Sequence, residues 1–295
     1  MTAEPRSWLF VPADSERKIV KALAGEADAI IFDLEDSVAP TSKAAARSIL
    51  KELPSRSGGP EWWVRINPIG SEHHNDDLEL IGIAGIHGIV LPKADGGWDI
   101  VELAHRAGSI PIHAIVTETA ASLFGMLSYR DPTSPLAAMS WGAEDLSAAL
   151  GASSKYDANG ELSFTYQLAR SLCLAGAVAA GVQPVDGVFA DFRDVEGLKR
   201  EAEAARREGF TGKLAIHPDQ VEVINAAFTP SEEEIAYARA VIDAFEAEPN
   251  AGVLSVGGKM VDRPHLLQAR RVLNNADREI ANGDSRESMG DIGVR

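Results

Sequence analysis

The chain alternates short apolar runs with longer segments in which apolar residues recur every three or four positions. The first pattern is typical of buried strands and the second of amphipathic helices. The runs that predict strands are residues 8–12, 29–34, 62–66, 88–91, 112–117, 137–141, 187–190 and 213–216. The segments that predict helices are residues 15–23, 42–53, 75–83, 98–106, 120–127, 164–180 and 195–208. The sequence therefore predicts a repeating strand–helix unit.

Strands that alternate with helices form parallel sheets through right-handed crossovers, and eight such units close a barrel. We therefore expect an α/β fold, a (β/α)8 TIM barrel, at residues 1–228. An open doubly wound sheet is the alternative, but it normally carries a glycine-rich phosphate loop after its first strand. Residues 12–15 stand at that place, and they contain no glycine.

A C-terminal helical arm, or lid, is expected at residues 229–280. Ser231 introduces a charged amphipathic helix at residues 231–245, and a second helix is predicted at residues 264–280. Residues 246–259 are expected to form a weakly structured connection, and residues 281–295 a polar tail. An addition of this kind serves as a lid or as an oligomer contact.

Composition limits the possible partners and location. Apolar residues make up 45% of the 295 residues and charged residues 24%, which is typical of a soluble globular protein. The net charge of −16 argues against nucleic acid and anionic membranes as partners. Cys173 is the single cysteine, so no intramolecular disulfide forms. Because the sequence also shows no signal peptide and no apolar run of about 20 residues, we expect a cytoplasmic protein.

Candidate chemistry lies where the predicted strands end, because barrel enzymes place their active site at the carboxyl ends of the strands. The polar residues at these ends are Asp33, Glu35, Asp36, Arg65, Asn67, Lys93, Glu118, Glu144, Asp145, Asp191 and His217. Such an excess of carboxylates is unfavourable without a cation. Oxygen ligands favour Mg²⁺ or Mn²⁺ over zinc. Glu118 and either Glu144 or Asp145 follow neighbouring strands and could bind one ion together with water and substrate.

The two bases at these strand ends allow different interpretations. Arg65 lies within an apolar strand and must meet an anion, which could be a substrate carboxylate or a neighbouring acid. Lys93 could form a Schiff base, but the surrounding acids give it no reason to lose its proton. We therefore expect Lys93 to pair with Asp33 or Glu35. Any of the acids could instead be a helix cap or a partner in a surface salt bridge.

Seven segments, in order, resemble a known family. They are residues 6–12, 33–38, 64–67, 91–93, 118–120, 142–146 and 212–218. Together they resemble the citrate lyase β-subunit/malyl-CoA lyase branch of the HpcH/HpaI aldolase superfamily, over residues 6–273. The resemblance implies a (β/α)8 barrel that makes or breaks a carbon–carbon bond between a 2-oxo acid and an acyl-CoA.

The resemblance also assigns roles to residues. It makes Glu118 and Asp145 the Mg²⁺ ligands, with Glu144 in support, and Arg65 the clamp on the substrate carboxylate. The residues that it implies for contacts with coenzyme A or the rest of the substrate are Phe10, Arg17, Lys21, Ile216 and His217. One departure is Ala13, where the family often has glycine.

The arm matches the family as well. Residues 258–264 resemble a segment in which an aspartate, here Asp262, is the catalytic acid/base and reaches the site of a neighbouring subunit. A homotrimer or higher homo-oligomer is therefore expected. From position alone, Asp262 could instead be the N-cap of the helix that follows Pro264.

These expectations combine into a Mg²⁺-dependent lyase that cleaves a 3-hydroxy-acyl-CoA, such as citramalyl-CoA or malyl-CoA, to acetyl-CoA and a 2-oxo acid. Three alternatives remain open at this point. The chain could be a citrate lyase β subunit that acts on a carrier-protein thioester, a malyl-CoA thioesterase, or a non-catalytic CoA-binding protein.

Overall fold

The computed structural model describes residues 4–54, 58–131 and 133–287. The chain divides into two compact units, one of residues 4–225 and a second that begins at Ala226. In the described part of the chain, no helix is long and apolar enough to span a membrane.

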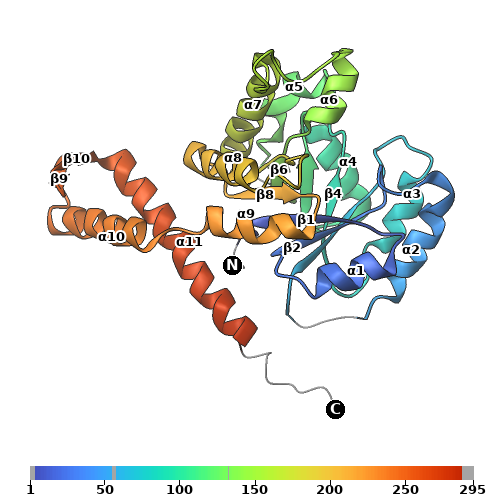
Figure 1. Cartoon of the computed structure of the whole chain (residues 1–295), viewed down its shortest axis with the longest axis horizontal. Helices are drawn as coiled ribbons and strands as arrows, with labels where there is room; N and C mark the ends of the chain where they lie inside the picture. Colours follow the sequence, from blue (N-terminus) through green and yellow to red (C-terminus); the bar gives the residue numbers. More distant parts are fainter. Residues whose placement is uncertain (1–3, 55–57, 132, 288–295) are drawn as a thin grey trace. The chain divides into compact units, whose positions relative to one another are not determined.

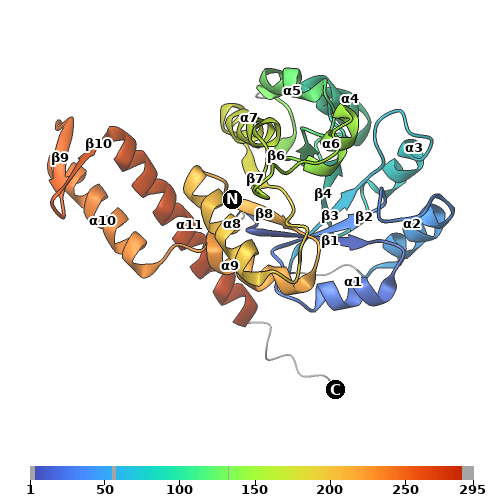
Figure 2. The ribbon, with the colours of Figure 1, turned by 45° about the horizontal axis from the view of Figure 1, so that its top comes forward.

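The first unit is a closed parallel barrel. In the described residues the strands follow one another in the order β1 to β8, and β8 pairs with β1 to close the ring. The strands are β1 (Ser7–Pro12), β2 (Ala29–Asp33), β3 (Glu61–Arg65), β4 (Ile86–Leu91), β5 (Ile112–Ile115), β6 (Leu136–Ser140), β7 (Gln183–Asp186) and β8 (Gly212–Ala215). Helices lie on the outside of this ring (Figure 1, Figure 2). The predicted TIM barrel is confirmed, and the open-sheet alternative is wrong.

Helices connect the strands, though several differ from the prediction. They are α1 (Glu16–Leu23), α2 (Lys43–Glu52), α3 (His74–Asp77), α4 (Gly97–Ala107), α5 (Ser122–Gly125), α6 (Ala143–Leu150), α7 (Phe164–Ala180), α8 (Val195–Glu208) and α9 (Val221–Phe228). The segments predicted at 75–83 and 120–127 are only single α turns followed by 3₁₀ turns. The prediction missed α6, whose first turn carries Glu144 and Asp145.

The seventh strand lies four residues earlier than predicted. It was expected at 187–190, but Gln183–Asp186 forms β7, and the apolar residues after it lie in the following loop. Proline cannot donate to a strand ladder, so Pro184 made this segment a poor strand candidate. Pro184 nevertheless contributes its carbonyl, which accepts from Thr211 N at 3.0 Å. The acid that ends the strand is therefore Asp186, not Asp191.

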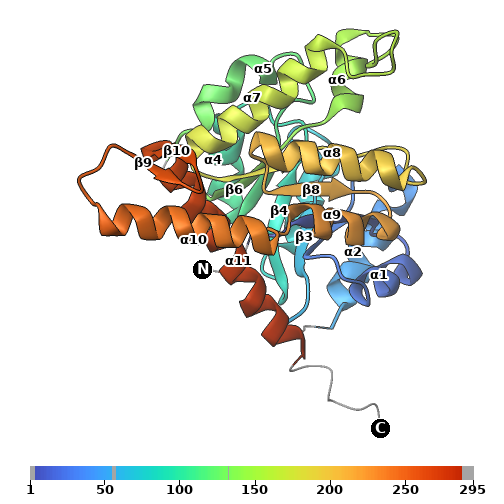
Figure 3. The same ribbon diagram turned by 60° about the vertical axis from the view of Figure 1, so that its left-hand side comes forward.

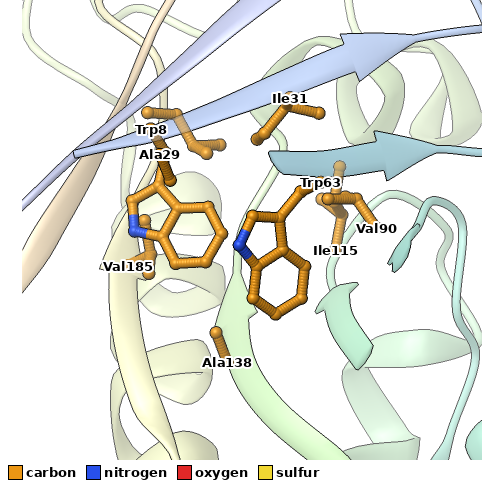
Figure 4. Close-up of a cluster of buried hydrophobic side chains, with 9 residues drawn as sticks. Trp8, Ala29, Ile31, Trp63, Val90, Ile115, Ala138 and Val185 are labelled. Carbon is orange, nitrogen blue, oxygen red and sulfur yellow. The ribbon is translucent and has the colours of Figure 1, made fainter. Parts of the chain in front are cut away.

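A packed core fills the barrel. Trp8 and Trp63 face each other there with ring centroids 5.0 Å apart, among small and branched side chains from the other strands (Figure 4). His113 packs edge-on against Trp8 at 4.6 Å, and its Nε2 lies 2.9 Å from Ser140 Oγ. Burial lowers the pKa of His113 to about 3, so the ring is neutral. The interior is thus closed to ligands, as in other TIM barrels.

The second unit contains α10 (Glu232–Ala247), the hairpin β9 (Val253–Val256) and β10 (Lys259–Asp262), and α11 (Arg263–Glu287). Figure 3 shows the hairpin joining the two helices. The connection predicted to be weakly structured is therefore an antiparallel hairpin. Gly257 and Gly258 form its two-residue turn with φ of 57° and 77°, a conformation that glycine adopts without strain. Val241, Phe245 and Val261 contribute to the small core of this unit.

Candidate active site

Arg65 is held by two buried acids. It ends β3 beside Asp33, which ends β2. Its Nε lies 2.7 Å from Asp33 Oδ1 and one terminal nitrogen 2.6 Å from Oδ2, while the other terminal nitrogen is 2.9 Å from Glu35 Oε2. Burial favours the neutral form of Asp33, but Arg65 holds the pKa of this carboxyl below its usual value. The partner of Arg65 is therefore an internal acid, one of the two options that the sequence left open.

Arg65 nevertheless keeps capacity for a ligand. A guanidinium group has five N–H donors, and the hydrogen bonds among the described residues use two of them, both to Asp33. The face of the group rests on Phe10, with the guanidinium carbon 4.7 Å from the ring centroid. Three N–H groups thus remain beside Glu35 and for a ligand oxygen, on a side chain that is fixed by its neighbours.

Glu118 follows β5 and is 4% exposed. Its Oε2 accepts a hydrogen bond of 2.6 Å from Lys93 N. On its other side lies Gly142, where an added Cβ would be only 2.8 Å from Glu118 Cγ. Burial raises the pKa of Glu118 to about 8, and the negative charges of Glu35 and Asp145 add to this effect. A nearby cation would therefore stabilise the ionised form considerably.

Lys93 connects the acids. Its Nζ lies 2.5 Å from Glu35 Oε1, 3.3 Å from Asp145 Oδ1 and 3.4 Å from Asp36 Oδ2. Burial opposes its charge, but these carboxylates hold the pKa of Lys93 above its usual value. The expected pair with Glu35 is confirmed, and the protonated amine is unsuited to Schiff-base chemistry.

Lys43 was missed by the sequence analysis. It begins α2 and is 5% exposed, and its Nζ donates to Leu34 O at 2.6 Å, Glu35 O at 2.8 Å and Asn67 Oδ1 at 2.8 Å. It therefore fixes the loop that carries Glu35. A lysine in the first turn of an amphipathic helix gives no sequence signal for such a role.

Glu144 and Asp145 diverge although they are adjacent. Lys155 pairs with Glu144, which is 62% exposed, whereas Asp145 turns toward Lys93. Both acids begin α6, where the helix dipole favours negative charge. Only Asp145 therefore joins the cluster around Glu118.

Phe10 packs against Arg65, but the other four residues expected to contact coenzyme A or the rest of the substrate lie outside this cluster. Arg17 and Lys21 are exposed on α1, four residues apart. Ile216 is 41% exposed after β8, and the ring of His217 stacks on Phe192 at 4.6 Å. No hydrogen bond or ion pair among the described residues joins these four predicted residues to the acids.

Asp262 belongs to the second unit, at the end of β10. Its Oδ1 lies 2.5 Å from His265 Nδ1, and the hydrogen bond with His265 lowers the pKa of Asp262. Asp262 is therefore an ionised, partly exposed carboxylate with one histidine partner.

Comparison with known proteins decides the family. Residues 6–218 match the model of the HpcH/HpaI aldolase/citrate lyase family. The chain belongs to this family. A (3S)-malyl-CoA thioesterase from Cereibacter sphaeroides strain KD131 is 40% identical over 278 residues, which cover 92% of this chain and 94% of the relative. The mitochondrial citramalyl-CoA lyase of Rattus norvegicus is 34% identical over 294 residues, covering 92% and 86%.

A solved structure extends the similarity to three dimensions. Protein CitE from Mycobacterium tuberculosis, in complex with magnesium, acetoacetate and coenzyme A, matches with a TM-score of 0.80 and 38% identity. The match covers 93% of this chain and 98% of CitE. The family indicated by the sequence motifs is confirmed, and with it an enzyme of the aldolase/lyase type.

The acid cluster of this HpcH/HpaI-family chain fits a hard divalent cation. Glu118 and Asp145 supply carboxylate oxygens that both contact Lys93, and burial disfavours the charge of Glu118 in the absence of a cation. Among the described residues, no group of three or more His, Cys, Asp or Glu side chains is arranged to hold a metal. Two protein ligands suit Mg²⁺, which usually keeps several waters and binds through one or two carboxylates plus substrate oxygens.

Proposed function

We propose that the protein is a Mg²⁺-dependent carbon–carbon lyase that cleaves a 3-hydroxy-acyl-CoA, such as citramalyl-CoA or malyl-CoA, to acetyl-CoA and a 2-oxo acid. One observation supports this proposal above all. At the ends of β3, β5 and β6, the fixed Arg65 still has N–H donors for a ligand, and Glu118 and Asp145 fit a cation. The complex of CitE with magnesium, acetoacetate and coenzyme A supports it.

The barrel residues would bind and orient the substrate. N–H groups of Arg65 that do not donate to Asp33 would bind the carboxylate of the 2-hydroxy acid part and offset its charge. Asp33 and Phe10 fix the plane of the guanidinium group and so fix the position of that carboxylate. Glu118 and Asp145 would hold Mg²⁺, which when bound supplies Lewis-acid polarisation of the oxygen on the carbon that becomes the oxo group.

Proton transfer at the acyl group is assigned to Asp262. Cleavage passes the hydroxyl proton to solvent water, breaks the carbon–carbon bond and leaves the electron pair on the acetyl-CoA enolate, while the Asp262 carboxylate takes up a proton from solvent. Asp262 would deliver a proton to the enolate carbon, and in the reverse direction it would take the methyl proton as a base. The hydrogen bond with His265 lowers the pKa of Asp262, so this carboxyl is ionised, which is the state that removal of the methyl proton requires.

The remaining assignments concern coenzyme A and assembly. Arg17 and Lys21 present two positive charges on one side of α1, which would complement the phosphates of coenzyme A in an otherwise acidic protein. Ile216 and His217 would contact another part of the substrate. We also infer a homotrimer or higher homo-oligomer in which Asp262 serves a neighbouring subunit. Light scattering coupled to size exclusion tests this assembly, and a monomer in active preparations would contradict it.

A thioesterase is the second candidate, because the (3S)-malyl-CoA thioesterase is 40% identical over nearly the whole chain. The two activities differ in their products. A lyase releases acetyl-CoA with pyruvate or glyoxylate, whereas a thioesterase releases free coenzyme A with the intact hydroxy acid.

The decisive experiment incubates the purified protein and Mg²⁺ with citramalyl-CoA and with malyl-CoA and quantifies all products by mass spectrometry. The lyase proposal expects acetyl-CoA and the oxo acid in equal amounts, with loss of both on addition of EDTA. Arg65→Lys keeps the charge but loses the fork, so its KM for the substrate should rise, while Glu144→Gln, on the neighbouring exposed acid, should behave as wild type. Free coenzyme A without acetyl-CoA would favour the thioesterase, and activity restricted to a carrier-protein thioester would favour a citrate lyase subunit. Absence of turnover with every one of these substrates would contradict the lyase proposal.

A further inference from the structure

Lys93 has a backbone conformation that residues other than glycine rarely adopt. Among the described residues it is the non-glycine residue with positive φ, at 53°. This conformation costs about 1 kcal/mol or more, and such outliers persist where the surrounding structure holds them. Here the conformation directs the Lys93 N–H onto Glu118 while the side chain runs to Glu35 and Asp145. One residue thus contacts acids that follow β2, β5 and β6.

The charges around Lys93 are unbalanced. Ion pairs join four carboxylates, Asp33, Glu35, Asp36 and Asp145, to the two bases Arg65 and Lys93, and a fifth, Glu118, accepts from the Lys93 backbone N–H. Arg65 is directed to Asp33 and Glu35, so the base that faces Asp145 is Lys93. Its side chain is 29% exposed, so the ammonium group has room to shift between carboxylates.

We propose that Lys93 is a built-in competitor of the divalent cation for Asp145. In the metal-free protein its ammonium group pairs with Asp145, and on metal binding it gives up this contact while keeping Glu35 and Asp36. The inference rests on the metal site of the proposed function and deepens it. Lys93 is a positioning residue, because it acts on the carboxylate that would hold the ion rather than on the substrate.

The test is a titration with Mn²⁺ in the absence of any substrate, in which electron paramagnetic resonance measures free Mn²⁺. Lys93→Met removes the competing charge and keeps a side chain of similar length. Its affinity for Mn²⁺ should rise about fivefold, the factor that corresponds to ~1 kcal/mol of released ion pairing. Lys93→Arg retains the charge and should stay close to wild type. Lys93→Gln provides a second neutral variant, and thermal melting checks that each variant folds.

Lys155→Met is the matched control. It removes the same charge from a lysine that pairs with Glu144, the residue next to Asp145. Its Mn²⁺ affinity should stay near the wild-type value, because Lys155 holds the acid that is outside the cluster.

Each outcome bears on the proposal. Equal or weaker Mn²⁺ binding by both neutral Lys93 variants would overturn it, and weaker binding would indicate that Lys93 merely holds the acids together. An equal gain in Lys155→Met would also overturn it, since the effect would then be one of general charge. Absence of Mn²⁺ binding by the wild type would refute both this inference and the metal site. Tighter Mn²⁺ binding by Lys93→Met, without any cleavage of citramalyl-CoA or malyl-CoA by the wild type, would support the competition by Lys93 and contradict only the proposed reaction.

Discussion

Gly142→Ala is predicted to displace Glu118 while leaving the backbone unstrained. Gly142 has φ −124° and ψ 116°, an extended conformation that alanine adopts freely. The new Cβ would lie 2.8 Å from Glu118 Cγ and 3.1 Å from Oε1, whereas carbon atoms in contact lie about 3.5–4.0 Å apart. The Glu118 side chain must therefore shift by about 1 Å.

The size of the expected effect follows from this displacement. Disturbing a group that supports a metal site typically costs about 10- to 100-fold in metal affinity. Misplacing a reacting group by about 1 Å can cost about 100-fold in rate. We expect Gly142→Ala to weaken Mn²⁺ binding at least tenfold and to lower kcat by about 100-fold, with a loss of about 1–3 kcal/mol in stability from overpacking.

The assay combines the Mn²⁺ titration with steady-state kinetics at saturating Mg²⁺ and with urea unfolding. Gly252→Ala is the control, because an added Cβ there meets no atom within 4 Å. Mn²⁺ affinity and kcat within twofold of wild type in a folded Gly142→Ala protein would refute the reasoning that this contact positions Glu118.

Three further predictions concern stability, pH and proton transfer. Lys213→Met should destabilise the barrel by about 1–3 kcal/mol in urea unfolding, because buried Asp186 loses one of its two cationic partners and keeps Arg170, while Lys199→Met at an exposed position of α8 should be neutral. Between pH 4.5 and 8 native Glu118 keeps a proton that the unfolded chain has lost, so the free energy of unfolding of the metal-free protein should fall as pH rises. Glu118→Gln should flatten this dependence of the free energy of unfolding on pH. An unchanged dependence in the variant would exclude Glu118 as its source. Asp262→Asn should retain Mn²⁺ binding and lose turnover, and unchanged turnover would remove Asp262 from the mechanism.

Much of the fold follows from the sequence because parallel strands buried on both faces read as short apolar runs. The ends of these runs also place Asp33, Arg65, Lys93 and Glu118 at one end of the barrel. The prediction from apolar runs failed at β7, because Pro184 makes this segment unlike a strand in sequence. Its carbonyl nevertheless accepts a hydrogen bond from Thr211 N.

The partners within the site were beyond prediction for a different reason. Whether Arg65 meets an internal acid depends on the register of β2 and β3, which sets Asp33 beside it. The buried role of Lys43 and the close contact of Gly142 with Glu118 likewise depend on distances between segments far apart in the chain. The periodicity of apolar residues along the chain carries no information on such distances.

The two packed indoles in the barrel interior give a spectroscopic signal without any added label. Trp8 on β1 and Trp63 on β3 are held 5.0 Å apart with their planes tilted by 58°, so their electronic transitions are coupled in a fixed, chiral arrangement. Near-ultraviolet circular dichroism depends on such fixed packing and disappears when side chains become fluid, even if helices and strands persist. The spectrum of this protein thus reports the fixed packing of its tryptophans, two of which fill the barrel interior.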